Sequence, residues 1–321
     1  MKFSFKIFNN SQEFIAGYQN ILDLQSTSHI FGSPYFLNYH TKINCSYIAF
    51  EKSGKLVAYL PYSVVDKNFL SHQGATYGGF VQLVNLKKQE IHYIYLEMIN
   101  YMKKVGAKTL TIRFLPSLFL NNKNEELNSY FKSKMITLFS EDEYYLTLDN
   151  NIKDIESVSF RKDHKRDIKK FANTNFEIIE DSTNENIEVF YRILKENLKK
   201  HKATPTHTLE ELNWLFEHLN NNFKLTLIKN TEKYLAGSVK ISLNSSTDYL
   251  IYVSLNYEPN IRGSLKYLYW FAAKDSFSHN KKYLTFGINN KSNEKKNVGL
   301  NSFKLGFRSK VILRDTYKLT I

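Results

Sequence analysis

The chain has 321 residues, of which 42% are hydrophobic and 15% are aromatic. This length suits two domains, and this composition fills their cores, so general disorder is excluded. The 44 basic and 31 acidic residues leave a net charge of +13, which favours RNA, nucleotide phosphates or an anionic membrane face as partners. A lysine-rich soluble protein without such a partner is the alternative.

The single cysteine, Cys45, excludes an intrachain disulfide and a thiolate zinc cluster, so a reducing compartment is expected. The opening stretch MKFSFKIFNN is interrupted by Lys6 and Asn9, whereas a signal peptide has an unbroken apolar core. No apolar run approaches the roughly 18 to 20 residues that span a bilayer. We therefore expect a cytoplasmic protein.

The first half of the chain is predicted to alternate helices and strands. Its first helix has Asn10 and Glu13 placed as a capping pair. Two runs rich in strand-forming residues follow, YIAF and KLVAYLPYSVV, and the turn formers Ser53 and Gly54 between them predict a hairpin. Apolar residues at helical spacing then indicate a helix over roughly Lys88 to Lys104, which precedes the strand KTLTIRF.

The order of hairpin, helix and strand returns in the second half. AFEKSGKLVAYLPYSVV begins at Ala49 and aligns with LIKNTEKYLAGSVKISL at Leu227, which is 178 residues later. KTLTI begins at Lys108 and aligns with KYLTF at Lys282, which is 174 residues later. An apolar helix lies between the two segments in both copies. This agreement in order, type and spacing predicts two tandem copies of one mixed domain.

A basic helix is predicted between the two copies. The segment NIKDIESVSFRKDHKRDIKKFA places Lys162, Lys165, Arg166 and Lys169 on one helical face. This face is either the solvated side of a linker or a contact for phosphate or RNA. The expected organisation is a first domain at 1–150, a connecting basic helix at 151–172 and a second domain at 173–321.

The second copy is predicted to open with two helices. The second helix starts at Thr208, with Glu211 three residues later as a capping box. Three strands follow, FKLTLIK, YLAGSVKISL and DYLIYVSL. Gly237 inside the middle strand indicates a bulge or a close approach of the backbone.

Several kinds of site are excluded by the sequence. It has no G-x-x-x-x-G-K-[ST] phosphate loop, no G-x-S-x-G elbow and no H-E-x-x-H. His201 and His207 do not share a helical face, so no metal site is expected. The acidic run from Glu141 to Glu143 is expected to face water in a polar connection rather than to form a catalytic pair.

Two stretches are candidate anion sites. Arg262 and Gly263 lead directly into a helix at Ser264, and the free backbone N–H groups of a helix start suit a phosphate or a carboxylate. A glycine that only shapes the turn is the alternative. In GLNSFKLGFRSK, Lys304 lies among apolar residues that include Phe303. This stretch is either the wall of a binding site or a core segment past which lysines reach water.

Six short landmarks, taken in order, resemble the Fem-type branch of the GNAT acyltransferase superfamily. They are FGSPYFLNYH, TYGGFV, SFRKDHKRDIKKF, DYLIYVSLN, SLKYLYW and LNSFKLGF, and they span nearly the whole chain. Members of this branch are two-domain aminoacyl and acyl transferases that modify cell-envelope precursors, those of peptidoglycan included. The resemblance implies an α+β fold of two tandem GNAT-like domains, each a mixed twisted sheet flanked by helices.

The resemblance also implies roles for individual residues. It places Phe303 and Lys304 at the reacting centre, where Lys304 would stabilise an oxyanion, and it makes Tyr252 a third catalytic candidate. Donor or phosphate binding is expected at Arg161, Lys165, Arg166, Arg262, Gly263 and Ser264. The turn before Ser264 keeps only part of the glycine-rich pattern with which GNAT enzymes hold acetyl-CoA, so the resemblance does not assure an acyl-CoA donor.

We therefore expect an N-acyltransferase without a permanently bound cofactor. It would move an acyl or aminoacyl group from acyl-CoA, an acyl carrier or aminoacyl-tRNA to a small-molecule amine, such as a cell-envelope precursor or an amino sugar. tRNA and an anionic membrane face are further expected partners, and the sequence indicates no oligomeric state. A non-catalytic RNA-binding protein and a degenerate transferase that acts as a scaffold are the alternatives.

Overall fold

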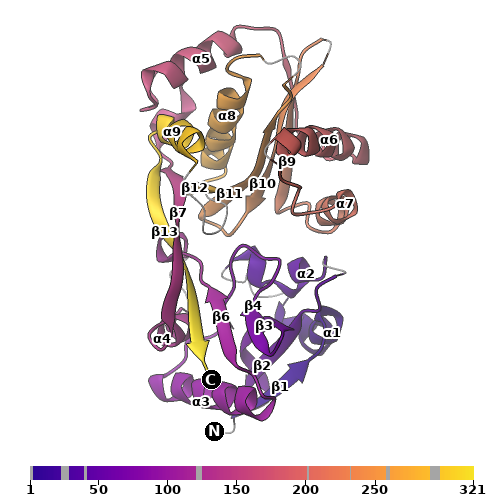
Figure 1. Cartoon of the computed structure of the whole chain (residues 1–321), viewed down its shortest axis with the longest axis vertical. Coiled ribbons are helices and arrows are strands. Elements are labelled where there is room, and N and C mark those ends of the chain that lie inside the picture. The colour runs from indigo at the N-terminus through magenta and orange to yellow at the C-terminus, as the bar shows by residue number, and fades with distance from the viewer. Residues whose placement is uncertain are drawn as a thin grey trace. The chain divides into compact units, whose positions relative to one another are not determined.

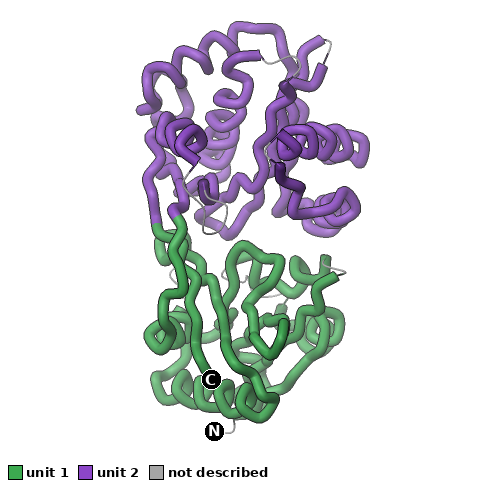
Figure 2. The backbone as a smooth tube through the Cα atoms, viewed as in Figure 1, with its two compact units in different colours: residues 1–141, 313–321 green, residues 142–312 purple. Residues whose placement is uncertain are grey.

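The computed structural model describes residues 3–22, 29–39, 42–120, 125–200, 202–231, 233–257, 261–289 and 297–321. The chain forms two compact units, residues 1–141 with 313–321 and residues 142–312 (Figure 2). Each unit is an α+β domain built on a mixed sheet with helices packed around it (Figure 1). Among the described residues, no helix has the length and apolar character needed to cross a membrane.

The described residues of unit 1 form six strands in one sheet path, with a short seventh at its side. The strands are β1 (Phe3–Phe8), β2 (Ser46–Lys52), β3 (Lys55–Val65), β4 (Asn68–Ser71), β5 (Val81–Gln82), β6 (Thr109–Arg113) and β13 (Lys310–Thr320). The helices are α1 (Ser11–Leu22), α2 (Pro34–Leu37), α3 (Lys88–Lys104) and α4 (Glu126–Lys132). The strand order is β1-β2-β3-β4-β6-β13, and β5 pairs with β3. β4 and β6 run parallel, and the other pairs are antiparallel.

The local signals in unit 1 have the effects predicted for them. Ser53 and Gly54 have positive φ angles of 51° and 77°, as the two-residue turn between β2 and β3 requires. The backbone N–H of Glu13 donates to Asn10 Oδ1 at 2.8 Å, which caps the start of α1. α3 has the predicted bounds, and its apolar face, which includes Met98, is buried in the core of unit 1.

Unit 2 repeats this plan with additional helices. Its strands are β7 (Ile136–Thr147), β8 (Glu177–Ile179), β9 (Phe223–Lys229), β10 (Tyr234–Ser242), β11 (Thr247–Leu255) and β12 (Tyr283–Ile288). Its helices are α5 (Lys162–Ala172), α6 (Asn184–Lys200), α7 (Leu209–His218), α8 (Ser264–Ser278) and α9 (Val298–Gly306). The strand order is β7-β12-β11-β10-β9-β8, in which β11 and β12 run parallel.

Two further predictions are confirmed in unit 2. Thr208 and Glu211 form the capping box at the start of α7. Gly237 allows a close approach, because a Cβ atom there would lie 2.7 Å from the ring of Phe190. The bulge of β10 lies just beyond, where the pairing with β11 shifts after Val239.

The two repeats exchange their last strands. Thr109 of β6 pairs with Thr320 of β13, and the equivalent Tyr283 of β12 pairs with Thr147 of β7. Residues 141–147 and 314–320 also share one pattern of burial along their strands. β7 follows the first repeat in the chain but completes the sheet of unit 2, whereas β13 follows the second repeat and completes the sheet of unit 1.

This exchange changes the expected organisation. Residues 313–321 lie in unit 1 rather than in a second domain at 173–321, and unit 2 begins at residue 142 rather than after 150. α5 is part of unit 2 and not a free connection, because its residues Ile168 and Phe171 are buried in two hydrophobic clusters of unit 2. The expectation that Glu141 and Glu143 face water is wrong, since both lie in β7 and are buried.

Candidate functional site

The carboxyl ends of β11 and β12 form the first candidate site of unit 2. These strands pair over three positions, 247–249 with 283–285. β11 continues to Leu255 and β12 to Ile288, with no further pairs between them among the described residues. The two strands therefore separate towards their carboxyl ends, which is where open sheets with parallel strands bind ligands.

Lys304 on α9 reaches the separated part of β12. Its Nζ donates to the carbonyl oxygens of Phe286, Gly287 and Ile288 at 2.8, 3.1 and 2.8 Å. The ammonium also lies 5.4 Å above the ring of Tyr144, and the residue is buried. Because these carbonyls occupy all three N–H groups, Lys304 holds α9 to the end of β12. An oxyanion there would have to replace one carbonyl, and the catalytic role of Lys304 stays a prediction.

Phe303 belongs to an aromatic cluster to which α5, α8 and the end of α9 contribute. Its ring centroid lies 5.2 Å from that of Tyr269 and 5.3 Å from that of Phe307. Its carbonyl accepts from His164 Nε2 at 3.0 Å. A Cβ atom on Gly306 would lie 2.1 Å from the imidazole of His164, so this glycine is required by packing. The structure therefore shows Phe303 in a packing role, and its predicted place at the reacting centre rests on the resemblance.

Tyr252 lies in the part of β11 beyond the pairs with β12, and it contacts His207. Its Oη lies 2.7 Å from His207 Nδ1 and accepts from the backbone N–H of His207 at 3.3 Å. Burial raises the pKa of Tyr252 to about 12, against hydrogen bonds from Thr206 and His207 that lower it. The phenol is therefore protonated at neutral pH. It suits donation of a hydrogen bond or proton and is a poor base.

At the start of α8, Arg262 contacts a carboxylate of the chain itself. Asp167 Oδ1 lies 3.2 Å from Arg262 Nε, and Asp167 Oδ2 lies 2.7 Å from Lys266 Nζ. Burial alone would raise the pKa of Asp167, but Lys266 and Arg262 lower it, so the carboxylate is charged. Gly263 has a φ of +98°, and a Cβ atom there would lie 2.3 Å from the backbone oxygen of Asp167. Ser264 is fully buried.

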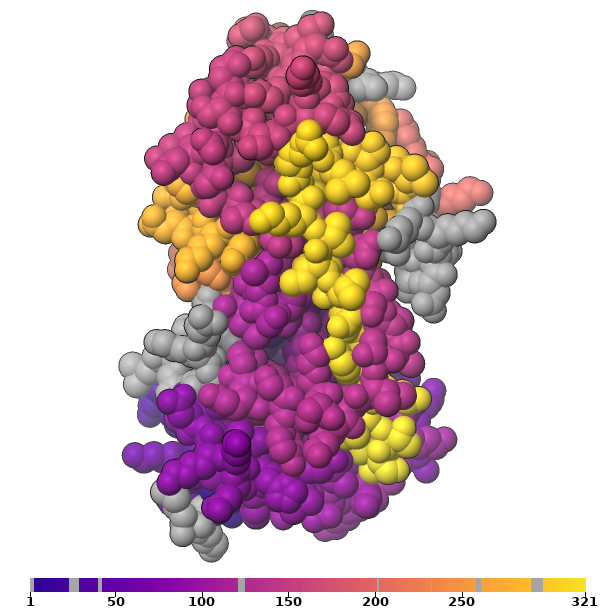
Figure 3. Space-filling view, turned by 90° about the vertical axis from the view of Figure 1, so that its left-hand side faces the viewer, coloured from indigo at the N-terminus to yellow at the C-terminus, as the bar shows by residue number. Residues whose placement is uncertain are grey.

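The basic face of α5 lines a hollow of about 430 Å³. The cations around it are Lys162, Lys165, Arg166, Lys169 and Lys170. Among the described residues of this lining, Glu156 is the one acidic residue, and it pairs with Lys169. Figure 3 shows the segment around α5, in magenta-pink, at the surface of unit 2. Arg161 does not line the hollow, and its guanidinium binds Asp163 at 2.5 and 2.9 Å.

Comparison with solved structures identifies the fold. FemX aligns with a TM-score of 0.67 and 11% identity, over 100% of this chain and 98% of FemX. The chain has the tandem GNAT-like fold of FemX. The C-terminal domain of a putative lysylphosphatidylglycerol synthetase from Agrobacterium fabrum aligns with a TM-score of 0.61 and 12% identity, over 96% of this chain and 92% of that one.

A tandem GNAT protein from the clavulanic acid biosynthesis pathway also shares the FemX-like fold. It aligns with a TM-score of 0.54 and 8% identity, over 99% of this chain and 98% of that one. No family model matches the chain, and no curated protein matches its sequence. The α+β fold of two GNAT-like units, which the order of the sequence landmarks predicted, is confirmed.

Three residues of the candidate site were not predicted from the sequence. Asp167 pairs with the predicted Arg262, His207 with the predicted Tyr252, and His164 with the backbone of Phe303. Asp167 and His164 stand in the basic segment, where the lysines dominate the pattern. His207 precedes a helix cap, which gave no signal of a contact with β11. His201 lies outside the described residues.

Proposed function

We propose that the protein is an N-acyltransferase that moves an acyl or aminoacyl group from an activated donor to the amine of a small acceptor. The observation that carries this proposal is the separation of β11 from β12 in a unit with GNAT-like topology. The buried ammonium of Lys304 contacts the carboxyl end of β12. The protonated phenol of Tyr252 belongs to β11. A cation and a proton donor suit the charge that develops when an amine attacks an ester or thioester.

The donor is proposed to be an aminoacyl-tRNA. At the start of α8, where a GNAT enzyme would hold the pyrophosphate of CoA, Arg262 and Lys266 are already paired with Asp167. The hollow on α5 has five cations against one carboxylate in its lining. Such a surface attracts a polyphosphate chain. The charge distribution thus supports a donor whose phosphates bind at α5.

A transfer assay tests the donor directly. Purified protein is incubated with charged tRNA or with acyl-CoA, together with amine acceptors that include amino sugars and peptidoglycan precursors. We expect amide formation from charged tRNA that ribonuclease abolishes. Transfer that resists ribonuclease and releases a free thiol would show that the donor is acyl-CoA and not aminoacyl-tRNA. Absence of transfer from both donors would refute the proposal.

Binding of RNA without catalysis is a second candidate, which the hollow on α5 favours. The same cations bind phosphates whether or not a reaction follows. This function predicts binding of uncharged RNA that weakens steeply with salt, and no formation of amide in the transfer assay. Contact of the same face with an anionic membrane stays a prediction.

A further inference from the structure

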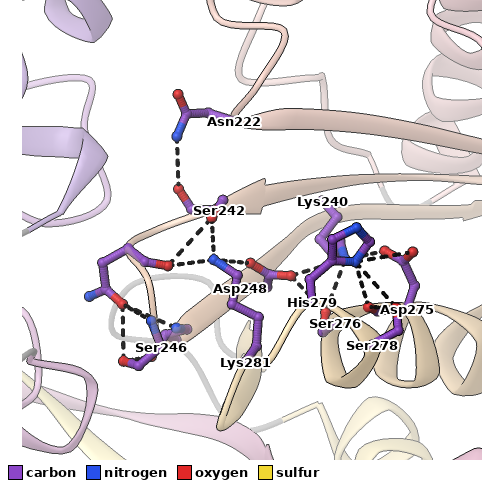
Figure 4. A network of polar contacts seen from close by, with 12 residues as sticks. Asn222, Lys240, Ser242, Ser246, Asp248, Asp275, Ser276, Ser278, His279 and Lys281 are labelled. Atoms are coloured by element: carbon purple, nitrogen blue, oxygen red, sulfur yellow. Dashed lines mark hydrogen bonds and ion pairs between the residues drawn. The ribbon is translucent and has the colours of Figure 1, made fainter. Parts of the chain in front are cut away.

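A second polar site lies at the opposite ends of β11 and β12, where both strands begin (Figure 4). The C-terminal end of α8, the end of β10 and the start of β9 also meet there. A pocket of about 500 Å³ is found among these elements. Its lining carries both signs of charge, on Lys224, Lys240, Lys281, Glu180, Asp248 and Asp275.

The deep part of this pocket is a fixed network. Lys240 Nζ lies 2.5 Å from Asp275 Oδ2, 3.0 Å from Asp248 Oδ2 and 3.0 Å from Ser276 Oγ. Ser276 Oγ donates to Asp248 Oδ2 at 2.8 Å. Lys240, Asp248 and Ser276 are buried. All three N–H groups of Lys240 therefore have acceptors, and this part of the pocket is preorganised.

The outer part of the pocket is open to water. Lys224 Nζ bridges Asp275 Oδ1 and Glu180 Oε1, each at 2.8 Å. The side chains of Lys224 and Glu180 are 31% and 38% exposed. Burial alone would lower the pKa of Lys224, but Asp275 and Glu180 raise it above its ordinary value. The ammonium of Lys224 is therefore charged and within reach of a ligand.

The six charges alternate in sign and add to zero. The ion pairs run from Glu180 to Lys224, Asp275, Lys240, Asp248 and Lys281. Asp248 Oδ1 accepts no hydrogen bond from the residues that the structure describes, although Lys281 Nζ lies 3.2 Å away. Stability does not account for such a network, because apolar side chains of similar volume stabilise a core as well or better.

The charges exclude most classes of ligand. A polyphosphate would meet three carboxylates, and a metal ion would meet three ammonium groups. An apolar ligand would find little to contact, since Phe223 is the one apolar side chain among the described residues of the lining. We infer that the pocket binds a small zwitterion with an ammonium and a carboxylate, such as a free amino acid. The ligand carboxylate binds Lys224, and its ammonium binds Glu180.

Direct binding tests this inference without any transfer reaction. The standard amino acids are screened singly by thermal shift, and those that stabilise the protein are titrated by calorimetry. We expect one or more to bind at a single site. Their N-acetyl derivatives lack the ammonium and their amides lack the carboxylate, so both should bind roughly tenfold or more weakly. Equal binding of either derivative, or no saturable binding by any amino acid, would overturn the inference.

Variants locate the site. Glu180→Gln and Lys224→Met each remove one charge of the outer pair, and each should weaken binding roughly tenfold or more. Lys233→Met is the control, because this exposed lysine immediately precedes the first residue of β10, whereas the pocket lies at the other end of that strand. If Lys224→Met does not fold, the more exposed Glu180→Gln decides the question. Unchanged affinity in folded Glu180→Gln would overturn the inference even if the transferase proposal holds.

Discussion

Arg314 and Glu141 occupy equivalent positions in the two repeats, and they form a buried salt bridge within unit 1. Arg314 Nη2 lies 2.8 Å from Glu141 Oε2, and Arg314 Nε donates to the same oxygen at 3.2 Å. Both residues are 5% exposed. The equivalence follows from the matching burial patterns of β7 and β13. One position of the repeat thus carries opposite charges in its two copies, and the charges neutralise each other.

Removal of one partner should destabilise unit 1 strongly. Glu141→Gln leaves the guanidinium of Arg314 buried without its carboxylate, and we expect a loss of about 3 kcal/mol or more in the free energy of unfolding. Urea titration measures this change. The swapped variant Glu141→Arg with Arg314→Glu should recover part of the loss. Lys310→Met, at an exposed position of the same strand, is the control. A change in Glu141→Gln no larger than that of the control would contradict the prediction.

Replacement of Lys304 separates its structural role from its predicted catalytic role. Lys304→Met leaves three carbonyl oxygens without their donor, and each buried unpaired group costs about 1 to 3 kcal/mol. We therefore expect a lower melting temperature and faster hydrogen exchange around residues 286–288. If Lys304 also stabilises an oxyanion, turnover falls by roughly 100-fold as well. If turnover is lost while stability is unchanged, Lys304 has the catalytic role but not the structural one.

Two glycines of α9 should respond oppositely to the same substitution. Gly306→Ala places a Cβ atom 2.1 Å from the buried imidazole of His164, so either this side chain or α9 must shift. Gly299→Ala meets one atom, Asn297 Oδ1 at 3.5 Å, and alanine favours helix by about 1 kcal/mol. We expect Gly306→Ala to lower the melting temperature and Gly299→Ala to preserve or raise it. Equal effects would show that the packing of Gly306 is not tight.

Two titrating groups of unit 1 should give opposite pH dependences. Burial lowers the pKa of His29 to about 4. The neutral imidazole therefore stabilises the folded state fully above pH 6.5, and this stabilisation is lost as the pH falls towards 4. That loss amounts to about 3 kcal/mol. Burial raises the pKa of Glu125 to about 7, so its contribution is complete below pH 4.5 and is lost as the pH rises to 7. Both residues line one pocket.

Single variants reveal the two slopes. In Glu125→Gln the effect of His29 is unopposed, so the free energy of unfolding should fall more steeply than in the unsubstituted protein between pH 6.5 and 4.5. In His29→Gln the effect of Glu125 is unopposed, and acidification over the same range should raise stability relative to the unsubstituted protein. Urea unfolding at several pH values measures both. Identical slopes in the two variants would disprove the assignment.

The cations of the α5 hollow should set the salt dependence of RNA binding. Lys162→Ala and Arg166→Ala each remove an exposed cation from the lining. Each should weaken binding of tRNA and reduce the slope of log Kd against log salt by roughly one. Lys88→Ala, at an exposed position of α3 in unit 1, is the control. If Lys88→Ala weakens tRNA binding to the same extent, tRNA does not bind preferentially to the basic face of α5.

Local signals predicted much of the fold, whereas contacts between distant segments escaped prediction. The Ser53–Gly54 turn, the bounds of α3 and the cap of α7 each depend on a few adjacent residues. The exchange of β7 and β13 could not be predicted, because the two strands share one burial pattern, which does not indicate the sheet that each completes. Likewise, nothing in the turn before α8 indicates that Arg262 pairs with Asp167, a carboxylate of α5.

Strand exchange has a consequence for biosynthesis. The segment 313–321, which completes the sheet of unit 1, is translated only after all of unit 2. Until then the nascent chain presents β6 as an unpaired edge, a feature prone to association with other chains. Premature termination near residue 312 would therefore harm the portion made first, because unit 1 completes its sheet only after residues 313–321 have been synthesised.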